Sequence, residues 1–198
     1  MVEMIINSDE ELLKLAYELG NPIPSRINGQ IIDTLMPLSE NEAHQYSLSA
    51  NFGINEFPFH TDGAYFKKPP KHILMRYIGS IDQPTPTIIG DLKYLDEDTM
   101  SELQFHVWKV KSRNSSFYSA ILSDDQEIYR YDSCIMQPVS KRLPLDFFQR
   151  IVDTTPKHTV TWELNKTIVI DNWTTVHKRL QVQKHEINNR KLQRIMIL

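Results

Sequence analysis

Two residues with metal-binding side chains stand close together in the first third of the sequence. His60 and Asp62 belong to the segment FPFHTDG, which spans residues 57–63. If His60 starts an extended segment, the two-residue repeat of a strand places both side chains on the same face, one strand repeat apart. An imidazole and a carboxylate in this arrangement can bind one ion.

A third ligand is needed to complete a metal site of this type. Two histidines and one carboxylate form the facial triad of non-haem Fe(II) centres, which leaves coordination positions open for a cosubstrate and O2. His177 is the candidate. It ends the segment TIVIDNWTTVH, which is typical of a buried strand, a polar turn and a residue just beyond that turn. We therefore expect His177 at the mouth of a barrel, where it completes a mononuclear Fe(II) site with His60 and Asp62.

Two arginines in the last segment, NRKLQRIMIL, are suited to bind an anion. Arg190 and Arg194 are four residues apart, and an even spacing keeps both guanidinium groups on one face of a strand. The planar fork of either group can grip a carboxylate through two parallel hydrogen bonds.

The three motifs HTD, DNWTTVH and RKLQR follow one another in an informative order. Together they resemble the taurine dioxygenase / clavaminate synthase-like family of Fe(II)/2-oxoglutarate oxygenases, over roughly residues 10–198. The resemblance implies a mainly β fold, with a double-stranded β-helix (jelly roll) core, an N-terminal helix and a few flanking helices. We expect one such domain over residues 1–198.

The resemblance also assigns roles to the charged residues. It makes His60, Asp62 and His177 the iron ligands. Arg190, thirteen residues after His177, matches the arginine that holds the distal carboxylate of 2-oxoglutarate. Arg194 matches a second arginine that contacts an anionic substrate group in some members, and it replaces Arg190 as the cosubstrate ligand if the strand register is shifted.

Further polar and charged residues near these motifs are also candidates for the site. Thr87, or failing that Thr85, lies where the family often has a threonine that hydrogen-bonds the cosubstrate carboxylate, although QPTPT replaces the Gly-rich turn expected there. Glu56, four residues before His60, either faces a substrate ammonium or is a solvated loop glutamate. The same two interpretations apply to Asn55 and Asn51. Arg130 either points into the site or lies at a strand edge.

The family chemistry implies oxidative decarboxylation of 2-oxoglutarate to succinate and CO2, coupled through Fe(II) and O2 to oxidation of an unactivated carbon. Because Asp62 is retained, hydroxylation is favoured over halogenation. A carboxylate at Glu56 and a guanidinium at Arg194 would suit a zwitterion. We therefore expect a small amino-acid-like metabolite as the substrate, free or bound to a larger carrier.

Two alternative functions remain open at this point. The same cofactors support desaturation, cyclisation or epoxidation, which no motif separates from hydroxylation. A cupin-type metal-binding protein without oxygenase activity is the third candidate, but such a protein has no reason to direct Arg190 at the metal. The chain is shorter than typical family members, so either the substrate binds in an open cleft, or another subunit or a carrier protein completes the site.

Composition excludes several other classes of protein. The chain has 198 residues, 40% hydrophobic and 24% charged, which is typical of one soluble globular domain. A net charge of -3 argues against nucleic-acid binding, and no stretch is apolar enough to indicate a membrane span or a signal peptide. Cys134 is the only cysteine, so we expect no intrachain disulfide and a reducing, cytoplasmic location. The oligomeric state is left open.

Sequence patterns also indicate the secondary structure. Ser8 and Glu11 have capping-box spacing and predict a helix over 9–19. Further helices are expected at 96–106, with Met100, Leu103 and Val107 on the apolar face, and at 144–153, where Pro144 occupies the first turn. The expected strands are 72–78, 116–122, 127–131, 159–163, 167–170 and 190–198. Residues 164–166 are expected to join two of them in a hairpin. This pattern favours a β-sandwich or jelly roll with helices outside it.

Overall fold

The computed structural model describes residues 1–26, 29–44, 47–112 and 115–198. The described chain is mainly β, with antiparallel sheets and few helices. Its strands are β1 (Val2–Ile5), β2 (Pro22–Ile23), β3 (Asp33–Leu35), β4 (His72–Tyr77), β5 (Thr87–Asp91), β6 (Trp108–Lys111), β7 (Ser116–Ser119), β8 (Met136–Pro138), β9 (Lys157–Val160), β10 (Lys166–Asp171), β11 (Thr175–Arg179) and β12 (Leu192–Ile197). Its helices are α1 (Asp9–Leu19), α2 (Leu48–Phe52), α3 (Glu97–Phe105) and α4 (Phe147–Thr154), with short 3-10 helices η1 (Leu92–Tyr94) and η2 (Lys184–Glu186).

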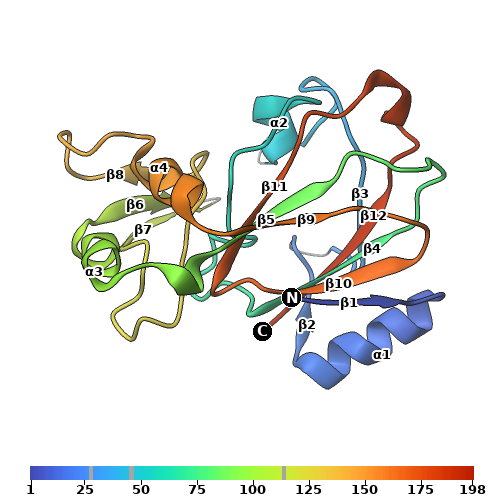
Figure 1. Ribbon diagram of the computed structural model, residues 1–198, viewed down its shortest axis with the longest axis horizontal. Helices are drawn as coiled ribbons and strands as arrows, with labels where there is room; N and C mark the ends of the chain where they lie inside the picture. Colours follow the sequence, from blue (N-terminus) through green and yellow to red (C-terminus); the bar gives the residue numbers. More distant parts are fainter. Residues whose placement is uncertain (27–28, 45–46, 113–114) are drawn as a thin grey trace.

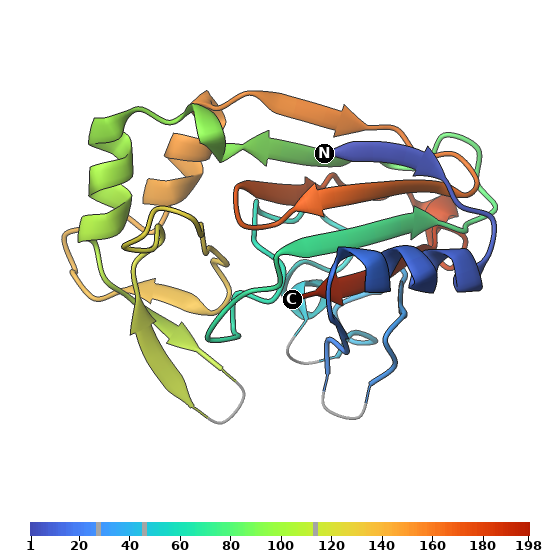
Figure 2. The same ribbon diagram turned by 90° about the horizontal axis from the view of Figure 1, so that it is seen from below.

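The strands pair into three antiparallel sheets in the described chain. The largest sheet has the order β1-β10-β4-β12-β2, with β3 also paired to β12. A second sheet has the order β11-β5-β9, and a third has the order β7-β6-β8. Figure 1 shows the third sheet at one end of the molecule, together with α3 and α4. Figure 2 shows β10, β4 and β12 crossing the other end side by side.

The largest sheet and the β11-β5-β9 sheet face each other across a shared apolar core. On β4, Ile73, Met75 and Tyr77 alternate with residues of the opposite face, as a strand requires. They belong to the same buried cluster as Ile89 of β5 and Val160 of β9. Each such side chain contributes about 1.5–3 kcal/mol by leaving water. This apolar cluster therefore stabilises the packing of the two sheets.

Helix α1 covers the outer face of the largest sheet. Leu12 and Ala16 are fully buried against Leu74, Ile195 and other outward residues of β4 and β12. The helix begins as its sequence predicts, because the Ser8 hydroxyl accepts a hydrogen bond from the Glu11 backbone N–H at 3.1 Å. The predicted helix 9–19 is confirmed at both ends.

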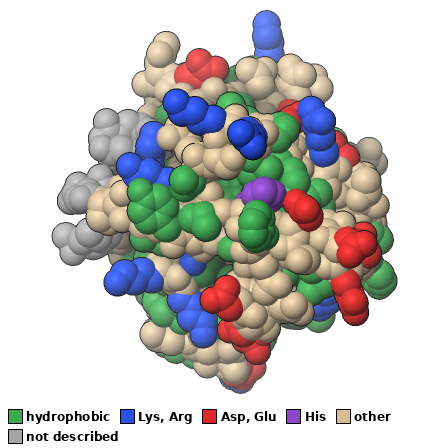
Figure 3. Space-filling view, turned by 90° about the vertical axis from the view of Figure 1, so that its left-hand side faces the viewer, with side chains coloured by type: hydrophobic (Ala, Val, Ile, Leu, Met, Phe, Trp, Pro, Cys, Tyr) green, Lys and Arg blue, Asp and Glu red, His purple; other side chains and the backbone are tan. Residues whose placement is uncertain are grey.

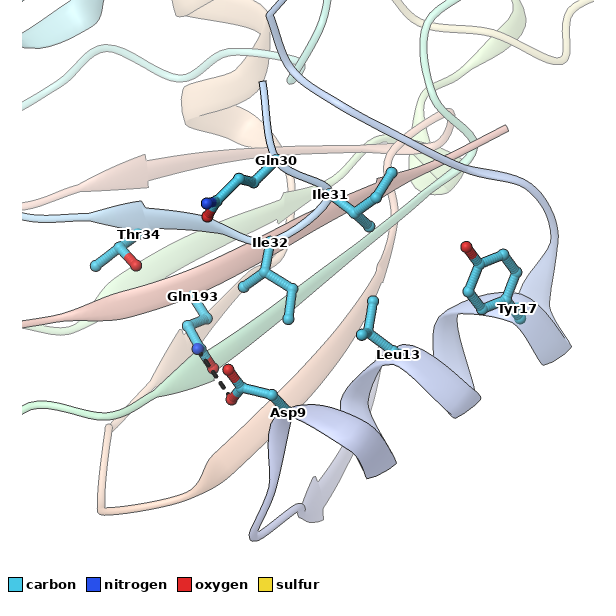
Figure 4. A pocket seen from close by; sticks show the side chains of 8 residues that line it. All are labelled: Asp9, Leu13, Tyr17, Gln30, Ile31, Ile32, Thr34 and Gln193. Atoms are coloured by element: carbon cyan, nitrogen blue, oxygen red, sulfur yellow. Dashed lines mark hydrogen bonds between the residues drawn. The ribbon is translucent and has the colours of Figure 1, made fainter. Parts of the chain in front are cut away.

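A groove of about 390 Å³ lies on this outer face, between α1 and residues 30–34. Figure 4 shows Leu13 and Tyr17 of the helix on one side of it, with the Asp9 carboxylate hydrogen-bonded to Gln193. Gln193 follows Leu192, whose side chain joins the core between the sheets. Because neighbouring strand residues point to opposite faces, this groove is on the far side of the sheet from that core.

Residues 92–156, between β5 and β9, build a lobe around the third sheet. Its core contains Leu103 of α3, Trp108 of β6 and Phe148 of α4, all buried. Phe59 and Val176 belong to the same cluster, so the lobe core extends to the residues that immediately precede His60 and His177. Figure 3 views the molecule from this end and shows hydrophobic side chains exposed at several places among basic and acidic ones. The exposed apolar residues include Phe105, Tyr118, Val139 and Leu145.

Several expected elements differ from the observed ones. The hairpin predicted around 164–166 is wrong: the chain does turn at Asn165, which has a φ of 65°, but β9 pairs with β5 and β10 pairs with β4 and β1. The turn therefore connects the two facing sheets. The predicted strand 127–131 is reduced to one bridge between Leu122 and Tyr129.

Other boundaries shift by a few residues. The helix predicted from 144 begins at Phe147. The carbonyl of Pro144 instead accepts the Phe147 N–H in the turn that precedes the helix. Val107, expected on the apolar face of α3, follows the helix and is 47% exposed. The last strand starts at Leu192, so Arg190 precedes it. In the described parts of the chain, no helix combines the length and apolarity needed to cross a membrane.

Candidate metal centre

His60 and His177 lie side by side through an isolated antiparallel bridge. The backbone N–H of each donates to the carbonyl of the other at 3.0 Å. Such a pair places the two side chains on the same side of the backbone, and the imidazole centroids are 4.4 Å apart. His177 occupies the middle of β11, not a position beyond a strand as its segment suggested.

Asp62 completes the group that the sequence expected to converge. One ligand atom from each of His60, Asp62 and His177 lies within 4.8 Å of the others, and all three residues are buried. The Asp62 Oδ2 atom is 3.6 Å from the His177 Nε2 atom. The donor set, two imidazoles and one carboxylate, is that of a non-haem iron site.

The backbone on both sides of Asp62 is fixed by a fully buried asparagine. The Asn172 Oδ1 atom accepts the Asp62 N–H at 3.0 Å. Its amide group donates to the carbonyls of Asp62, at 3.0 Å, and Pro70, at 2.8 Å. Asn172 belongs to the turn between β10 and β11. Asn172 of the DNWTTVH motif therefore fixes the backbone of Asp62 to the turn that precedes the strand of His177.

The residues between and after the first two candidate ligands also have structural roles. The Thr61 hydroxyl donates to the carbonyl of Tyr129 at 3.2 Å and accepts the N–H of Tyr131 at 3.1 Å. Gly63 has a φ of 68°, and a Cβ atom there would lie 2.7 Å from the Cδ atom of Pro70. The HTDG sequence is thus specified at each position by packing or hydrogen bonding.

The protonation states suit metal binding. The His60 Nδ1 atom is 3.0 Å from the carbonyl of Pro58, which favours a proton on Nδ1 and leaves Nε2 free as a ligand. Burial lowers the pKa of His177 to about 3, with the nearby His60 acting in the same direction. For Asp62, burial acts to raise the pKa, but Arg194 and the two imidazoles together hold it below its usual value.

One carboxylate oxygen of Asp62 lacks a hydrogen-bond partner in the described chain. Its Oδ2 is buried and has no hydrogen-bond partner among the described residues, although a buried carboxylate oxygen normally has one. A cation bound between this oxygen and the imidazoles would satisfy it, so the residues present fit a divalent metal ion.

Arg194 reaches the triad from the opposite sheet. Its Nη1 atom donates to the Asp62 Oδ1 atom at 2.7 Å, and its Nη2 atom donates to the Asp33 Oδ2 atom at 3.1 Å. Its Nε atom is buried without a partner in the described chain. Arg194 therefore replaces an apolar residue on the inner face of β12, between Leu192 and Met196.

Arg190 is buried at the end of the same inner face. Its Nε atom donates to the carbonyl of Thr85 at 3.1 Å, whereas its Nη2 atom is buried with no partner among the described residues. Burial lowers the pKa of Arg190 to about 10, so the guanidinium is still charged at neutral pH. A buried cation with an unpaired donor is a favourable place for a carboxylate.

The two candidate threonines differ in what their hydroxyl groups already bind. The Thr85 hydroxyl donates to the Glu186 Oε1 atom at 2.6 Å. The Thr87 hydroxyl instead accepts the indole N–H of Trp162 at 3.1 Å, so its own proton is available to an acceptor. On the paired strands β5 and β11, Thr87 lies opposite Arg179, two residues from the pair of Ile89 and His177. The geometry therefore favours Thr87 over Thr85 as a cosubstrate contact.

The expected substrate residues on the preceding loop lie at the surface. The Glu56 carboxylate is 50% exposed and pairs with Lys178 at 2.5 Å. Lys178 stands between His177 and Arg179 on β11, so its side chain points to the opposite face. Asn55 and Asn51 are also exposed. This arrangement favours the solvated ion pair for Glu56 over the substrate contact that the sequence suggested.

A different acidic residue, Asp132, interacts electrostatically with two of the candidate metal ligands. Asp132 is half-buried, and burial raises its pKa while the nearby His60 imidazole opposes that shift and Asp62 adds to it. Arg130, two residues earlier, was expected either to point into the site or to lie at a strand edge. Its guanidinium instead donates to the backbone carbonyls of residues 64, 66 and 67. The only signal for Asp132 in the sequence is that it ends the strand-like segment YRYD. The structure shows that the preceding residue, Tyr131, binds Thr61.

Solved structures share this fold, whereas no protein-family model and no curated protein matches the chain. An asparagine oxygenase in complex with Fe(II), 2S,3S-3-hydroxyasparagine and succinate superposes with a TM-score of 0.75 at 20% identity, covering 98% of this chain and 67% of that one. The non-heme iron oxygenase OrfP in complex with Fe, succinate and (3S)-hydroxy-L-Arg gives a TM-score of 0.74 at 20% identity, covering 96% and 64%. The PvcB protein from Pseudomonas aeruginosa gives 0.68 at 16% identity, covering 98% and 72%. The chain spans about two thirds of the length of the oxygenase structures.

Proposed function

We propose that this protein is an Fe(II)- and 2-oxoglutarate-dependent oxygenase that hydroxylates an unactivated carbon of a small amino-acid-like metabolite. The observation that carries the proposal is the buried triad of His60, Asp62 and His177, with its ligand atoms within 4.8 Å, together with Arg194 of β12 and the buried Arg190 just before that strand. In this proposal the largest sheet and the β11-β5-β9 sheet are the halves of a double-stranded β-helix, and residues 1–198 are one domain.

The metal ligands would be the Nε2 atom of His60, the imidazole of His177 and the Oδ2 atom of Asp62. Iron bound there would supply O2 activation coupled to decarboxylation of 2-oxoglutarate. The protein holds its own ligands in the required protonation states, because burial keeps His177 neutral and Arg194 helps to keep Asp62 ionised.

The cosubstrate would be held at its distal carboxylate by Arg190 and Thr87. The Arg190 Nη2 atom has no partner in the described chain, and the Thr87 hydroxyl proton is not committed to Trp162. Tyr77 is buried near these groups: it interacts electrostatically with Arg190, and its ring is 6.5 Å from that of Trp162. Apolar walls of this kind exclude water and strengthen the ion pair.

The substrate class follows from two further charged residues near the triad. Asp132 is a half-buried carboxylate that interacts electrostatically with His60, and the Arg194 guanidinium has an Nε atom without a partner among the described residues. A zwitterion would meet both charges and leave neither unpaired. The asparagine oxygenase and OrfP structures, which contain hydroxylated amino acids, support this class of substrate, free or bound to a carrier.

The alternatives make different demands on the site. A cupin-type protein without oxygenase activity would not need the buried guanidinium of Arg190, whose Nη2 atom has no hydrogen-bond partner among the described residues, so Arg190 argues against it. Desaturation, cyclisation and epoxidation use the same residues, and the product analysis of the turnover reaction separates them from hydroxylation.

The cofactor part of the proposal is tested by anaerobic spectroscopy. Fe(II) and 2-oxoglutarate added together should produce a weak visible charge-transfer band, and admission of O2 should give succinate. Arg190→Met should raise the 2-oxoglutarate concentration needed for half of the band about tenfold or more, because a charge-assisted pair is lost. A wild-type protein without the band, or an Arg190→Met protein with unchanged titration, would refute the assignment.

The substrate part is tested by a panel of free amino acids scored for substrate-stimulated succinate release. Stimulation should depend on both the amino and the carboxylate group of the compound. Asp132→Asn should reduce the stimulation, whereas Glu56→Gln is the matched control and should behave as wild type because that carboxylate pairs with Lys178 at the surface. If Glu56→Gln reduces the stimulated succinate release and Asp132→Asn does not, the substrate contact would be Glu56 and not Asp132.

A further inference from the structure

Glu186 is a buried carboxylate that the proposed reaction does not use. It is 2% exposed and lies in η2, between β11 and β12. Its Oε1 atom accepts the Thr85 hydroxyl at 2.6 Å, and its Oε2 atom accepts the Thr85 N–H at 2.9 Å. A carboxylate with the two donors of one residue on its two oxygens fixes the position of that residue closely.

Thr85 passes this constraint on to Arg190. The Thr85 carbonyl accepts the Arg190 Nε–H at 3.1 Å. The Glu186 backbone carbonyl also accepts the Arg190 N–H at 2.8 Å, and the Glu186 Oε2 atom is 3.8 Å from the Arg190 Nε atom. Glu186 therefore holds the backbone of Arg190 directly and its side chain through Thr85. The Arg190 Nη2 atom has no partner among the described residues.

The charges near Glu186 do not balance among the described residues. Arg179 and Arg190 are both buried, burial and the charge of Arg190 lower the pKa of Arg179, and Glu186 is the carboxylate that acts on both arginines. The other contacts of the Arg179 guanidinium in the described chain are the neutral carbonyls of Gly53 and Asn55 and the ring of Phe57. Two buried positive charges and one negative charge leave a net positive charge, which one further carboxylate would neutralise.

We propose that Glu186 is the positioning residue of the cosubstrate site: through Thr85 it aims the free edge of Arg190 at the distal carboxylate of a 2-oxo dicarboxylic acid. This inference rests on the proposed function. It predicts that Glu186 affects recognition of the distal carboxylate alone and leaves the binding of the 2-oxo acid end at the metal unchanged.

The test compares two probes that differ only at the distal end. 2-Oxoglutarate and 2-oxopentanoate share the 2-oxo acid group, but the second has a methyl group in place of the distal carboxylate. The dissociation constant of each is measured anaerobically from the Fe(II) charge-transfer band. A parallel measurement records the increase in melting temperature that 2-oxoglutarate gives the metal-free protein.

Three variants separate positioning from charge and from general stability. Glu186→Ala should raise the dissociation constant of 2-oxoglutarate about tenfold or more and leave that of 2-oxopentanoate within about twofold. Glu186→Gln keeps acceptor and donor groups for Thr85, so it should retain 2-oxoglutarate binding to within about threefold. Thr85→Val keeps the backbone contacts but removes the hydroxyl donor. It should weaken 2-oxoglutarate binding about threefold to tenfold, and this result decides the matter if Glu186→Ala does not fold.

Each contrary result has a definite meaning. If Glu186→Ala, or Thr85→Val in its place, weakens both probes equally or neither, Glu186 does not position Arg190. If Glu186→Gln weakens 2-oxoglutarate binding as much as Glu186→Ala, the charge and not the hydrogen bonding is responsible, and the inference is overturned. If the wild-type protein itself does not prefer 2-oxoglutarate to 2-oxopentanoate, the cosubstrate assignment fails and the inference fails with it.

Discussion

Asn172 offers the most direct test of how this fold builds its metal site. Its side chain is fully buried and makes three hydrogen bonds to the backbone, two of them to Asp62 and one to Pro70. Asn172→Ala would leave one N–H and two carbonyl groups buried without these partners. At about 1–3 kcal/mol for each buried group left unpaired, the free energy of unfolding should fall by about 3 kcal/mol or more.

The same substitution should affect the metal site beyond its effect on stability. The Asp62 backbone would no longer be tied to the turn that precedes β11, so the carboxylate would lose its fixed position relative to His177. Loss of such a supporting contact typically costs about tenfold to a hundredfold in metal affinity. The two effects are measured by urea unfolding of the metal-free protein and by titration with Co(II), a divalent probe for the same donor set.

Thr174→Val is the matched control in the same turn. The Thr174 hydroxyl is buried and has no hydrogen-bond partner in the described chain, so replacing it by a methyl group should change the unfolding free energy by less than about 0.5 kcal/mol or increase it. A loss below about 1 kcal/mol for Asn172→Ala, or a loss of stability with unchanged Co(II) affinity, would refute the view that Asn172 holds Asp62 in place.

Three further substitutions test other parts of the site. His60→Ala should abolish the increase in melting temperature that Co(II) gives the wild-type protein, because one of three ligands is removed. Gly63→Ala should lower the unfolding free energy by about 1–3 kcal/mol, because the φ of 68° and the contact with Pro70 both disfavour a Cβ atom. Arg130→Met should lower it by about 2–4 kcal/mol in urea unfolding, because the backbone carbonyls of residues 64, 66 and 67 lose their donor; an unchanged midpoint would show that water replaces the guanidinium.

The features that could be predicted from the sequence are those that short segments determine. The two-residue spacing of His60 and Asp62 and the capping pair at Ser8 and Glu11 each act within a few residues, and the structure brings the first pair to His177 and starts α1 at the second. Arg194 lies on the inner face of β12 as expected, but Arg190 precedes that strand, so its burial does not follow from the even spacing. Their roles as ligands of a metal and of a cosubstrate stay predictions.

The features that could not be predicted depend on pairing between distant segments. Residues 159–163 and 167–170 have the local pattern of a hairpin, but the partners of β9 and β10 lie 67–99 residues earlier in the chain, in β5 and β4. The position of Asp132 has the same origin, because it is brought to His60 by hydrogen bonds between Thr61 and the strand-like segment that ends at Tyr131. Glu56 was the local choice for an acidic residue near the metal, and its partner Lys178 comes from a strand more than a hundred residues away.

The contacts of Arg194 would allow one site to serve a metal, a cosubstrate and a charged substrate. Arg194 is shared between Asp62 and Asp33, which accept hydrogen bonds from separate nitrogen atoms of the guanidinium. If a cation bound at the candidate triad drew the Asp62 carboxylate away from Arg194, the guanidinium would still keep a partner in Asp33, and the cost of leaving it unpaired would be avoided. The nitrogen atom so released, and the Nε atom that has no partner among the described residues, would then be donors for an incoming carboxylate. Asp33, which pairs with Arg194 across the sheet, would in this way link loading of the metal site to anion binding beside it.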